Sequence, residues 1–304
     1  MSEQACLFTL LRLDDSQTKP AMNGRTRLRP LSSRAPALNG LVVVAPDTEV
    51  NLSRIDPGGT PGRLSKSKGE RRVEKLRERL LELQEALYAE HRRSLLIVVQ
   101  ALDTGGKDGA IKKICSGLDP NGVQLTNFKY PTAEEWDHDF LWRIHHAAPR
   151  KGAIGIWNRS HYEDVLVPRV HGQITEALWR ERCNDINAFE AMLSRNGVTF
   201  LKFFLHISKE EQKERLQARL DEPDKLWKFN PGDLKERALW EKYQRAYEAV
   251  ISACSTACAP WHIVPANRKW LRNLIMLEMI VAALEKMNPQ YPAPAFDPKT
   301  ITIE

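Results

Sequence analysis

The chain has 304 residues, of which 28% are charged, and a mean hydropathy of −0.45. These values predict a soluble protein with one large domain and exclude a membrane protein, because no apolar run approaches the roughly 20 residues that a spanning helix needs. The net charge of +6 and the pI near 9.0 favour a polyanionic partner such as a nucleotide or a phosphate polymer. Five scattered cysteines without metal-ligand spacing, and an N-terminus unlike a secretory signal, predict reduced thiols and a cytoplasmic location.

The first 62 residues are rich in Pro, Gly, Ser, Asn and Arg, which predicts a poorly ordered N-terminal extension. Within it only Leu41–Ala45 resembles a strand. From Glu70 to Arg93 apolar residues recur three and four positions apart, which predicts an amphipathic helix. We expect the main domain to cover residues 63–292 and to be followed by a C-terminal tail at 293–304.

A glycine-containing turn follows the next apolar run. Leu95–Val99 is long enough for one buried strand, and Gly105, Gly106 and Lys107 lead from it into a helical pattern. A strand, a glycine turn, a lysine and a helix form a phosphate-binding loop, in which backbone N–H groups and the helix N-terminus face phosphate oxygens. A glycine-rich turn with a surface lysine is the alternative, since short motifs also match by chance.

The match to the pattern G-x-x-x-x-G-K-[ST] is imperfect at two positions. Ala101 replaces the first glycine, and Asp108 replaces the hydroxyl residue that usually holds magnesium. Asp103, inside the turn, would repel phosphate unless it holds Mg²⁺, which prefers oxygen ligands. The departures therefore predict a metal ligand within the loop itself.

Strands and helices alternate through the rest of the chain. The patterns predict strands at 122–128, 153–157, 199–207 and 261–265, and helices at 133–147, 173–195, 234–256 and 268–287, with a further helix opening at Ser208. Such alternation implies an α/β fold with a parallel sheet covered on both faces. Ligands of such sheets bind at the carboxyl ends of the strands.

Charged residues follow the predicted strand at 153–157. Arg159 is placed to stabilise the charge of a transferring phosphoryl group. Glu163 and Asp164 could reach back to a metal ion, or they could form the first turn of a helix, where acids suit the helix dipole. Both interpretations stay open.

A second charged segment, residues 221–233, breaks the helical pattern with two prolines and a glycine. It and the helix before it carry the basic residues Arg215, Arg219, Lys225 and Lys228. A mobile flap of this kind could close over phosphates and exclude water, although a solvated charged loop is the alternative. Lys112 and Lys113, beyond the glycine turn, could extend a phosphate track and so suit an extended anion.

From about Glu70 to Met287 the chain resembles the polyphosphate kinase 2 family. The resemblance is carried by DTGGKDGAI, NFKYPTAEEWDHDFLWRIH, NRSHYEDVLVPRVH, LKFFLHISKEEQKERLQARL with DKLWKF, and APWHIVPANRKWLRN, in the same order. It implies a P-loop kinase-like three-layer α/β sandwich, with a parallel sheet of about five strands, helices on both faces and a helical lid at about 209–240. It also implies reversible phosphoryl transfer from inorganic polyphosphate to a nucleoside mono- or diphosphate, with Mg²⁺, which Mn²⁺ can replace. Ala101 and Trp157 depart from the usual glycine and phenylalanine.

The resemblance also implies roles for individual residues. Catalytic roles are expected for Asp103, Lys107, Arg159, Arg215 and Arg219. Phosphate or polyphosphate binding is expected at Thr104, Gly105, Gly106, Asp108, Gly109, Lys112, Lys113, Lys225 and Lys228. Nucleotide binding is expected at Phe128, Lys129, Pro131, Thr132, Asn158 and Tyr162. A metal ion is expected at Asp103, with Glu163 or Asp164 as a further ligand.

The expected partners are inorganic polyphosphate and nucleoside mono- and diphosphates, without nucleic acid or membrane. NRSHYEDVLV resembles the branch that handles nucleoside monophosphates and in some members also diphosphates. The resemblance further suggests a homodimer or homotetramer, for which the leucine-rich helix from Val73 to Leu87 is a candidate contact. Two other functions stay open: an ATP-dependent nucleoside monophosphate kinase on the same fold, and a non-catalytic polyanion-binding protein.

Overall fold

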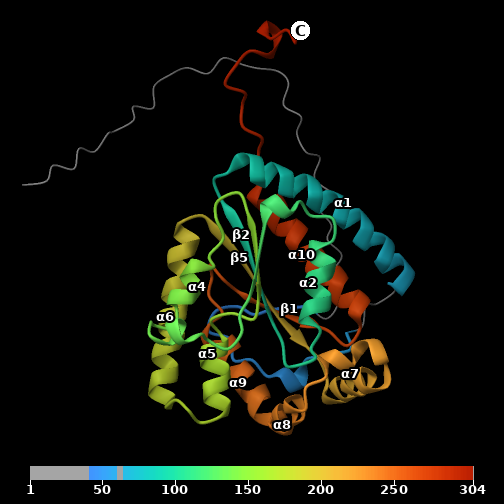
Figure 1. Cartoon of the computed structure of the whole chain (residues 1–304), viewed down its shortest axis with the longest axis vertical. Helices are drawn as coiled ribbons and strands as arrows, with labels where there is room; N and C mark the ends of the chain where they lie inside the picture. Colours follow the sequence, from blue (N-terminus) through green and yellow to red (C-terminus); the bar gives the residue numbers. More distant parts are fainter. Residues whose placement is uncertain (1–40, 60–63, 304) are drawn as a thin grey trace, which may run out of the picture. The chain divides into compact units, whose positions relative to one another are not determined.

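The computed structural model describes residues 41–59 and 64–303, and within them it forms a six-stranded sheet (Figure 1). The strand order is β1-β6-β5-β2-β4-β3. The strands are β1 Val42–Val43, β2 Ser94–Gln100, β3 Val123–Asn127, β4 Ile154–Asn158, β5 Val198–His206 and β6 Trp261–Pro265. Across the sheet, the strands β6, β5, β2, β4 and β3 each pair in parallel with their neighbours. The edge strand β1 pairs antiparallel to β6. The predicted α/β fold with a mostly parallel sheet is therefore confirmed.

Helices cover both faces of this sheet. They are α1 Lys66–Glu90, α2 Lys107–Cys115, α3 Ala133–Trp136, α4 Trp142–His146, α5 Glu163–Val170, α6 Glu176–Arg195, α7 Lys209–Asp221, α8 Gly232–Ala238, α9 Trp240–Ala253 and α10 Lys269–Met287. Helices α1, α2 and α10 lie on one side of the strands and α4, α5 and α6 on the other (Figure 1). The described elements thus form three layers. Helix α7 lies near the carboxyl end of β2, where the glycine turn begins.

The sheet is built around β2, whose residues Leu95 to Val99 are completely buried. A central parallel strand is covered on both faces, so it is apolar throughout rather than alternating. The carboxyl ends of β2 and β4 lie side by side, with Val99 paired to Asn158. This register brings the glycine turn next to the segment that begins at Asn158.

Two predicted helices are each divided into two. The predicted helix at 133–147 is α3 and α4, because the Asp139 carboxylate accepts a hydrogen bond from the N–H of Leu141 at 2.9 Å and so competes with a continuous helix. The predicted helix at 234–256 is α8 and α9, which are separated at Leu239. Short 3-10 turns lie at Leu52–Arg54, Pro120–Gly122 and Pro298–Thr300. A longer 3-10 turn spans Pro223–Lys228.

Composition predicts that residues 41–59 belong to a poorly ordered extension, whereas the structure packs part of this segment against the main domain. Val44 is 2% exposed and Leu52 1%. The N–H of Val44 donates to the Trp261 carbonyl at 2.9 Å, and the N–H of Leu52 donates to Glu248 Oε1 at 2.8 Å. A few apolar residues in a polar segment therefore pack against β6 and α9, a contact that composition does not show. The same prediction for residues 1–40 and 60–62 lies outside the described part of the chain.

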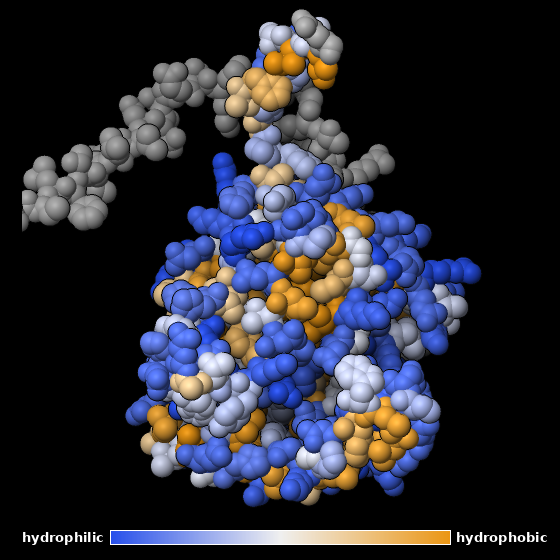
Figure 2. Space-filling view, viewed as in Figure 1, coloured by the Kyte–Doolittle hydropathy of each residue, from blue (hydrophilic) through white to orange (hydrophobic). Residues whose placement is uncertain are grey.

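The leucine stripe of α1 packs inside the chain. Leu80, Leu83 and Leu87 are at most 2% exposed, and α1 packs along α10. These side chains are therefore not available as the predicted contact between copies. None of the described helices is long and apolar enough to cross a bilayer. Hydrophilic residues cover most of the face seen in Figure 2.

Close packing of α1 on α10 generates a prediction at Gly69. A Cβ atom at this position would lie 2.6 Å from the Trp270 ring. Gly→Ala in a helix usually stabilises by about 1 kcal/mol, but here we expect G69A to lower the free energy of unfolding by about 1–3 kcal/mol through overpacking. Urea unfolding of G69A, alone and combined with Trp270→Leu, checks this. The smaller partner should restore stability, and a G69A protein more stable than the parent would contradict the packing account.

Candidate active site

The glycine loop, residues 101–106, connects β2 to α2 and has a tightly constrained backbone. Thr104 and Gly106 have positive φ angles of 59° and 94°. A Cβ atom on Gly105 would lie 2.5 Å from the Cβ of Ala101. The Leu102 carbonyl oxygen would lie 2.8 Å away as well, so position 105 has no room for a side chain. The loop thus accommodates Ala101 by keeping glycine opposite it.

Cationic and amide side chains hold the carbonyl groups of this loop. Lys107 Nζ donates to the Ala101 carbonyl at 2.9 Å, and Arg215 Nη1 donates to the Thr104 carbonyl at 3.1 Å. Gln212 Nε2 donates to the Asp103 carbonyl at 2.9 Å. Helix α7 is therefore docked on the glycine loop through two of its side chains. Carbonyl oxygens engaged in this way repel a nearby phosphate less than free ones would.

Lys107 begins α2 and is half-buried. Burial lowers the pKa of its ammonium group from the ordinary value, although the nearby Asp103 carboxylate acts to raise it. A phosphate in the loop would oppose the effect of burial and favour the charged lysine. This is the behaviour expected of a lysine that binds an anion.

The structure brings Asp103 and Arg159, two of the predicted site residues, into contact. Arg159 Nη2 donates to Asp103 Oδ1 at 3.2 Å, and the N–H of Arg159 donates to the Val99 carbonyl at 3.1 Å. Burial acts to lower the pKa of Arg159, but the carboxylates of Glu163 and Asp103 together raise it above its ordinary value. Arg159 is thus a fixed positive charge between two acids.

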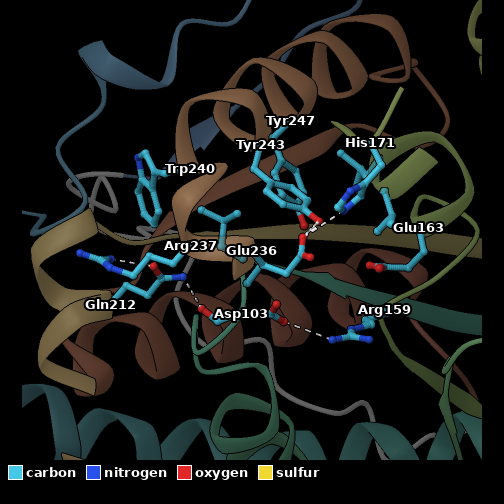
Figure 3. A pocket seen from close by; sticks show the side chains of 14 residues that line it. Asp103, Arg159, Glu163, His171, Gln212, Glu236, Arg237, Trp240, Tyr243 and Tyr247 are labelled. Atoms are coloured by element: carbon cyan, nitrogen blue, oxygen red, sulfur yellow. Dashed lines mark hydrogen bonds and ion pairs between the residues drawn. The ribbon is translucent and has the colours of Figure 1, made fainter. Parts of the chain in front are cut away.

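The two neighbouring acids, Glu163 and Asp164, point to different places. Glu163 lines a pocket together with Asp103 and Arg159 (Figure 3). Asp164 instead pairs with Arg143 of α4 at 3.3 Å. Both also lie in the first turn of α5, as the alternative interpretation had it. Of the two acids, Glu163 is therefore the one that shares a pocket with Asp103.

The residues present fit a divalent cation that substrate phosphates would help to bind. Burial raises the pKa of Glu163, although Arg159 and Lys107 act to lower it. Such a buried carboxyl group is one that a nearby cation would stabilise in its charged form. Three or more His, Cys, Asp or Glu side chains do not cluster as a metal site anywhere in the described ranges. Two carboxylates are nevertheless enough for Mg²⁺, which usually keeps waters and takes further oxygens from phosphates.

The expectation that Tyr162 binds a nucleotide is contradicted. Its side chain is completely buried, and its hydroxyl donates to Glu190 Oε1 at 2.9 Å. Lys202 Nζ donates to the same hydroxyl at 2.8 Å and to Glu190 Oε2 at 2.7 Å. Although burial acts to raise it, Lys202 and His161 hold the pKa of Glu190 below its ordinary value. This buried cluster of Tyr162, Glu190 and Lys202 anchors the segment that carries Arg159 and Glu163.

A basic groove runs from the glycine loop along α7 and the segment after it. Predicted residues that line it are Asp103, Thr104, Gly105, Gly106, Lys107, Asp108, Gly109, Phe128, Lys129, Asn158, Arg159, Arg215, Arg219, Lys225 and Lys228, and the structure adds Asn127, Ala218, Asn230, Asp233, Lys269 and Arg272. Asn158 Nδ2 bridges Asp108 and Asn127, with both N···O distances at 2.9 Å. Sequence reasoning missed Lys269 and Arg272, which come from a distant helix.

Besides Tyr162, Glu163 and Asp164, four predicted residues do not line this groove. Lys112 and Lys113 are exposed further along α2. Pro131 precedes α3, and the Thr132 hydroxyl accepts a hydrogen bond from the Glu135 N–H at 3.2 Å as a helix cap. Their proposed roles in substrate binding therefore receive no support from the groove.

A second pocket, here called the aromatic pocket, shares Asp103 and Arg159 with the groove (Figure 3). Its walls include Trp240, Tyr243 and Tyr247 of α9, with His171 and Glu236 at one side. Tyr243 donates to Glu236 Oε2 at 2.6 Å, and His171 Nε2 lies 3.2 Å from the same oxygen. Asp103 and Arg159 are thus approached from two cavities.

Comparison with known proteins gives a consistent result. A family model described as "Polyphosphate kinase 2 (PPK2)" matches residues 63–292. The chain is 48% identical over 262 residues to an AMP/ADP-polyphosphate phosphotransferase of Meiothermus ruber, covering 86% of this chain and 98% of that protein. It is 43% identical to an ADP-polyphosphate phosphotransferase of Rhodopseudomonas palustris, covering 71% of this chain and 78% of that protein. The crystal structure of polyphosphate kinase 2 from Arthrobacter aurescens superimposes with a TM-score of 0.80 at 45% identity, covering 82% and 89% of the two chains.

The buried cluster generates a prediction at Lys202. Lys202→Met leaves the buried Glu190 carboxylate without its cation, so we expect the free energy of unfolding to fall by about 3–5 kcal/mol. Urea unfolding measures the loss. Lys286→Met, at an exposed position of α10, is the matched control. Equal stabilities of the two variants would show that the cluster does not hold this part of the fold together.

Proposed function

Because the chain belongs to the polyphosphate kinase 2 family, we propose that it transfers a phosphoryl group from inorganic polyphosphate to AMP and, in a further reversible transfer, to ADP. The observation that carries the proposal is the basic groove, in which nine lysines and arginines face only three acids. A surface with this charge suits an extended polyanion better than one small nucleotide. The groove includes Asp103 and Arg159 and is lined by residues from several elements, which allows both substrates to reach one reaction centre.

The proposed reaction is a direct transfer between the two substrates. The terminal phosphate of the polyphosphate lies in the glycine loop near Lys107 and Arg159. A terminal phosphate oxygen of the nucleotide attacks it in line, one P–O bond forms, and the bond to the next bridging oxygen breaks and leaves a shorter chain. Since the attacking oxygen is already ionised near neutral pH, positioning and electrostatic stabilisation replace a strong general base.

The remaining predicted contacts are assigned by proximity to this centre. Phe128, Lys129 and Asn158 lie at the end of the groove near β3 and β4, where we propose that the nucleotide binds. Arg219, Lys225 and Lys228 lie further along, where we propose that the chain of phosphates continues. Arg219 Nη1 already donates to Asp233 Oδ2 at 3.1 Å, so this part of the lid is held near the groove.

We propose that Asp103 and Glu163 hold Mg²⁺, which Mn²⁺ can replace. When bound, this ion would neutralise phosphate charge and orient the oxygens of both substrates. With the two carboxylates bound to the ion, the guanidinium group of Arg159, which lies beside both of them, would face the transferred phosphoryl group.

The activity is tested by incubating the purified protein with Mg²⁺, polyphosphate and either AMP or ADP, without ATP, and separating the nucleotides by chromatography. ADP formed from AMP supports the proposal, and ATP formed afterwards shows that diphosphates are accepted. Activity that needs ATP and ignores polyphosphate would instead indicate a nucleoside monophosphate kinase. Polyphosphate binding by a folded protein without any product would indicate the non-catalytic polyanion-binding protein.

Loss of a central charge should slow the reaction without unfolding the protein. We expect Lys107→Met and Asp103→Asn each to lower kcat by about 10²–10³, as for removal of one electrostatic donor at a transition state. Steady-state kinetics with polyphosphate and AMP checks this. Lys113→Met, on the exposed face of α2, is the matched control. A D103N or K107M enzyme with nearly normal turnover would overturn the assignment.

The metal assignment distinguishes two adjacent acids. Chelation of divalent ions by EDTA should abolish turnover, and Mg²⁺ in excess should restore it. Glu163→Gln should raise the Mg²⁺ concentration for half-maximal rate at least about tenfold, whereas Asp164→Asn should change it less than about threefold because Asp164 pairs with Arg143. The opposite ranking of the two variants would place the metal at Asp164.

A further inference from the structure

Arg272 lies in the first turn of α10, far along the chain from the glycine loop, yet its side chain reaches that loop. Its Nη1 donates to the Gly106 carbonyl at 3.1 Å, and its Nε and Nη2 donate to Asn273 Oδ1 at 3.1 and 2.8 Å. The residue is 2% exposed and lies in the wall of the basic groove. It is thus a desolvated guanidinium directly behind the loop.

This guanidinium lacks the carboxylate partners that other buried arginines have. Arg79 pairs with Glu82 and Glu285 at 2.8 and 3.1 Å. Arg143 pairs with Asp164 and Glu135 at 3.3 and 3.6 Å. Among the residues that the structure describes, these two and Arg272 are the buried arginines, and Arg272 forms no ion pair with a carboxylate.

The positive charge of Arg215 adds to the cost of burying the Arg272 guanidinium group without a counter-charge. Burial, with a further contribution from the neighbouring Arg215, lowers the pKa of Arg272 to about 10. A Cβ atom on Gly106 would lie 2.4 Å from Nη1 of Arg272 and 3.1 Å from Nη1 of Arg215, so both guanidinium groups close on the same glycine. A buried charge is costly unless a counter-charge accompanies it. The free protein therefore bears a cost that a bound anion would remove.

We propose that Arg272 is a phosphate-positioning residue, which holds Gly106 in its binding conformation and supplies the buried positive charge that the terminal phosphates of a polyphosphate chain neutralise. The inference rests on the proposed function and extends it to a residue outside the loop, lid and strand-end motifs. It follows that binding of the anion is coupled to the stability of the folded protein. A polyphosphate should stabilise this protein by more than the exposed lysines of the groove would explain.

The test measures the melting temperature of the whole chain with and without tripolyphosphate, and the KM values for polyphosphate and for AMP. The variants are Arg272→Met, which removes the charge, and Arg272→Lys, which keeps the charge but loses the planar fork. Arg79→Met is the matched control, because Arg79 is a buried arginine with carboxylate partners on the outer helix α1.

For R272M we expect a melting temperature without ligand that equals or exceeds that of the parent, together with loss of most of the shift produced by tripolyphosphate. Its KM for polyphosphate should rise about 10- to 100-fold, as for loss of a charge-assisted hydrogen bond, while KM for AMP changes little. R272K should fall between R272M and the parent. R79M should melt at a lower temperature without ligand and keep the full shift.

Two outcomes would overturn the inference. One is an R272M protein with an unchanged tripolyphosphate shift and an unchanged KM for polyphosphate. The other is an R272M protein that, like R79M, melts early without ligand and keeps the shift, which is the behaviour of a purely structural arginine. If the parent catalyses no transfer, the proposed function fails, but the melting experiment still decides whether Arg272 responds to phosphate.

Discussion

The rest of the structure depends on one constraint, which is that several positive charges are gathered around the glycine loop, residues 101–106. Lys107, Arg215 and Arg272 come from three different helices, and each donates a hydrogen bond to a carbonyl of the glycine loop. Cations this close repel one another, so they need both a fixed scaffold and an anion to neutralise them. The scaffold is the three-layer sandwich, and under the proposed function the anion is the polyphosphate.

The opposite side of the site is fixed by a buried ion pair. Lys202 and Glu190 are fully buried, and with Tyr162 they lie beneath the turn that carries Arg159 and Glu163. A buried pair of this kind contributes little to net stability compared with apolar residues but fixes one arrangement of the chain around it. The pairing of β2 with β4 then places Arg159 beside Asp103. The positions of Asp103 and Arg159 are thus set by the core.

Local patterns in the sequence predicted the features that local chemistry determines. The glycine loop and the strand before it follow from short motifs, and the placing of Asp103 and Arg159 at one edge of the sheet follows from the rule that parallel strands end there. Their direct ion pair was not predicted. Glu163 and Asp164 could not be distinguished, because which side of a helical turn faces the site depends on how α5 packs. Tyr162 was assigned wrongly because a polar tip next to a site residue does not reveal whether it faces solvent or core.

Other features depend on contacts between distant segments. Lys202 gave a signal, since a lysine within an apolar strand has to find a buried partner, but Glu190 could not be identified without the fold. Arg272 stands in a segment that carries the family resemblance, but no role could be assigned to it, because an arginine near the start of a helix is ordinary until α10 is seen to reach Gly106. Residues 41–59 were expected to be poorly ordered because composition does not show that their few apolar side chains have partners in distant parts of the chain, such as β6 and α9.

The most direct test of the account is a crystal structure of the protein with tripolyphosphate. We expect the terminal phosphates to lie in the glycine loop, within hydrogen-bonding distance of Lys107 and Arg159, with the chain continuing toward Arg219. A tripolyphosphate bound instead along the exposed lysines of α2, with the glycine loop unoccupied, would contradict the central claim that this cluster of cations is built to receive the phosphate chain.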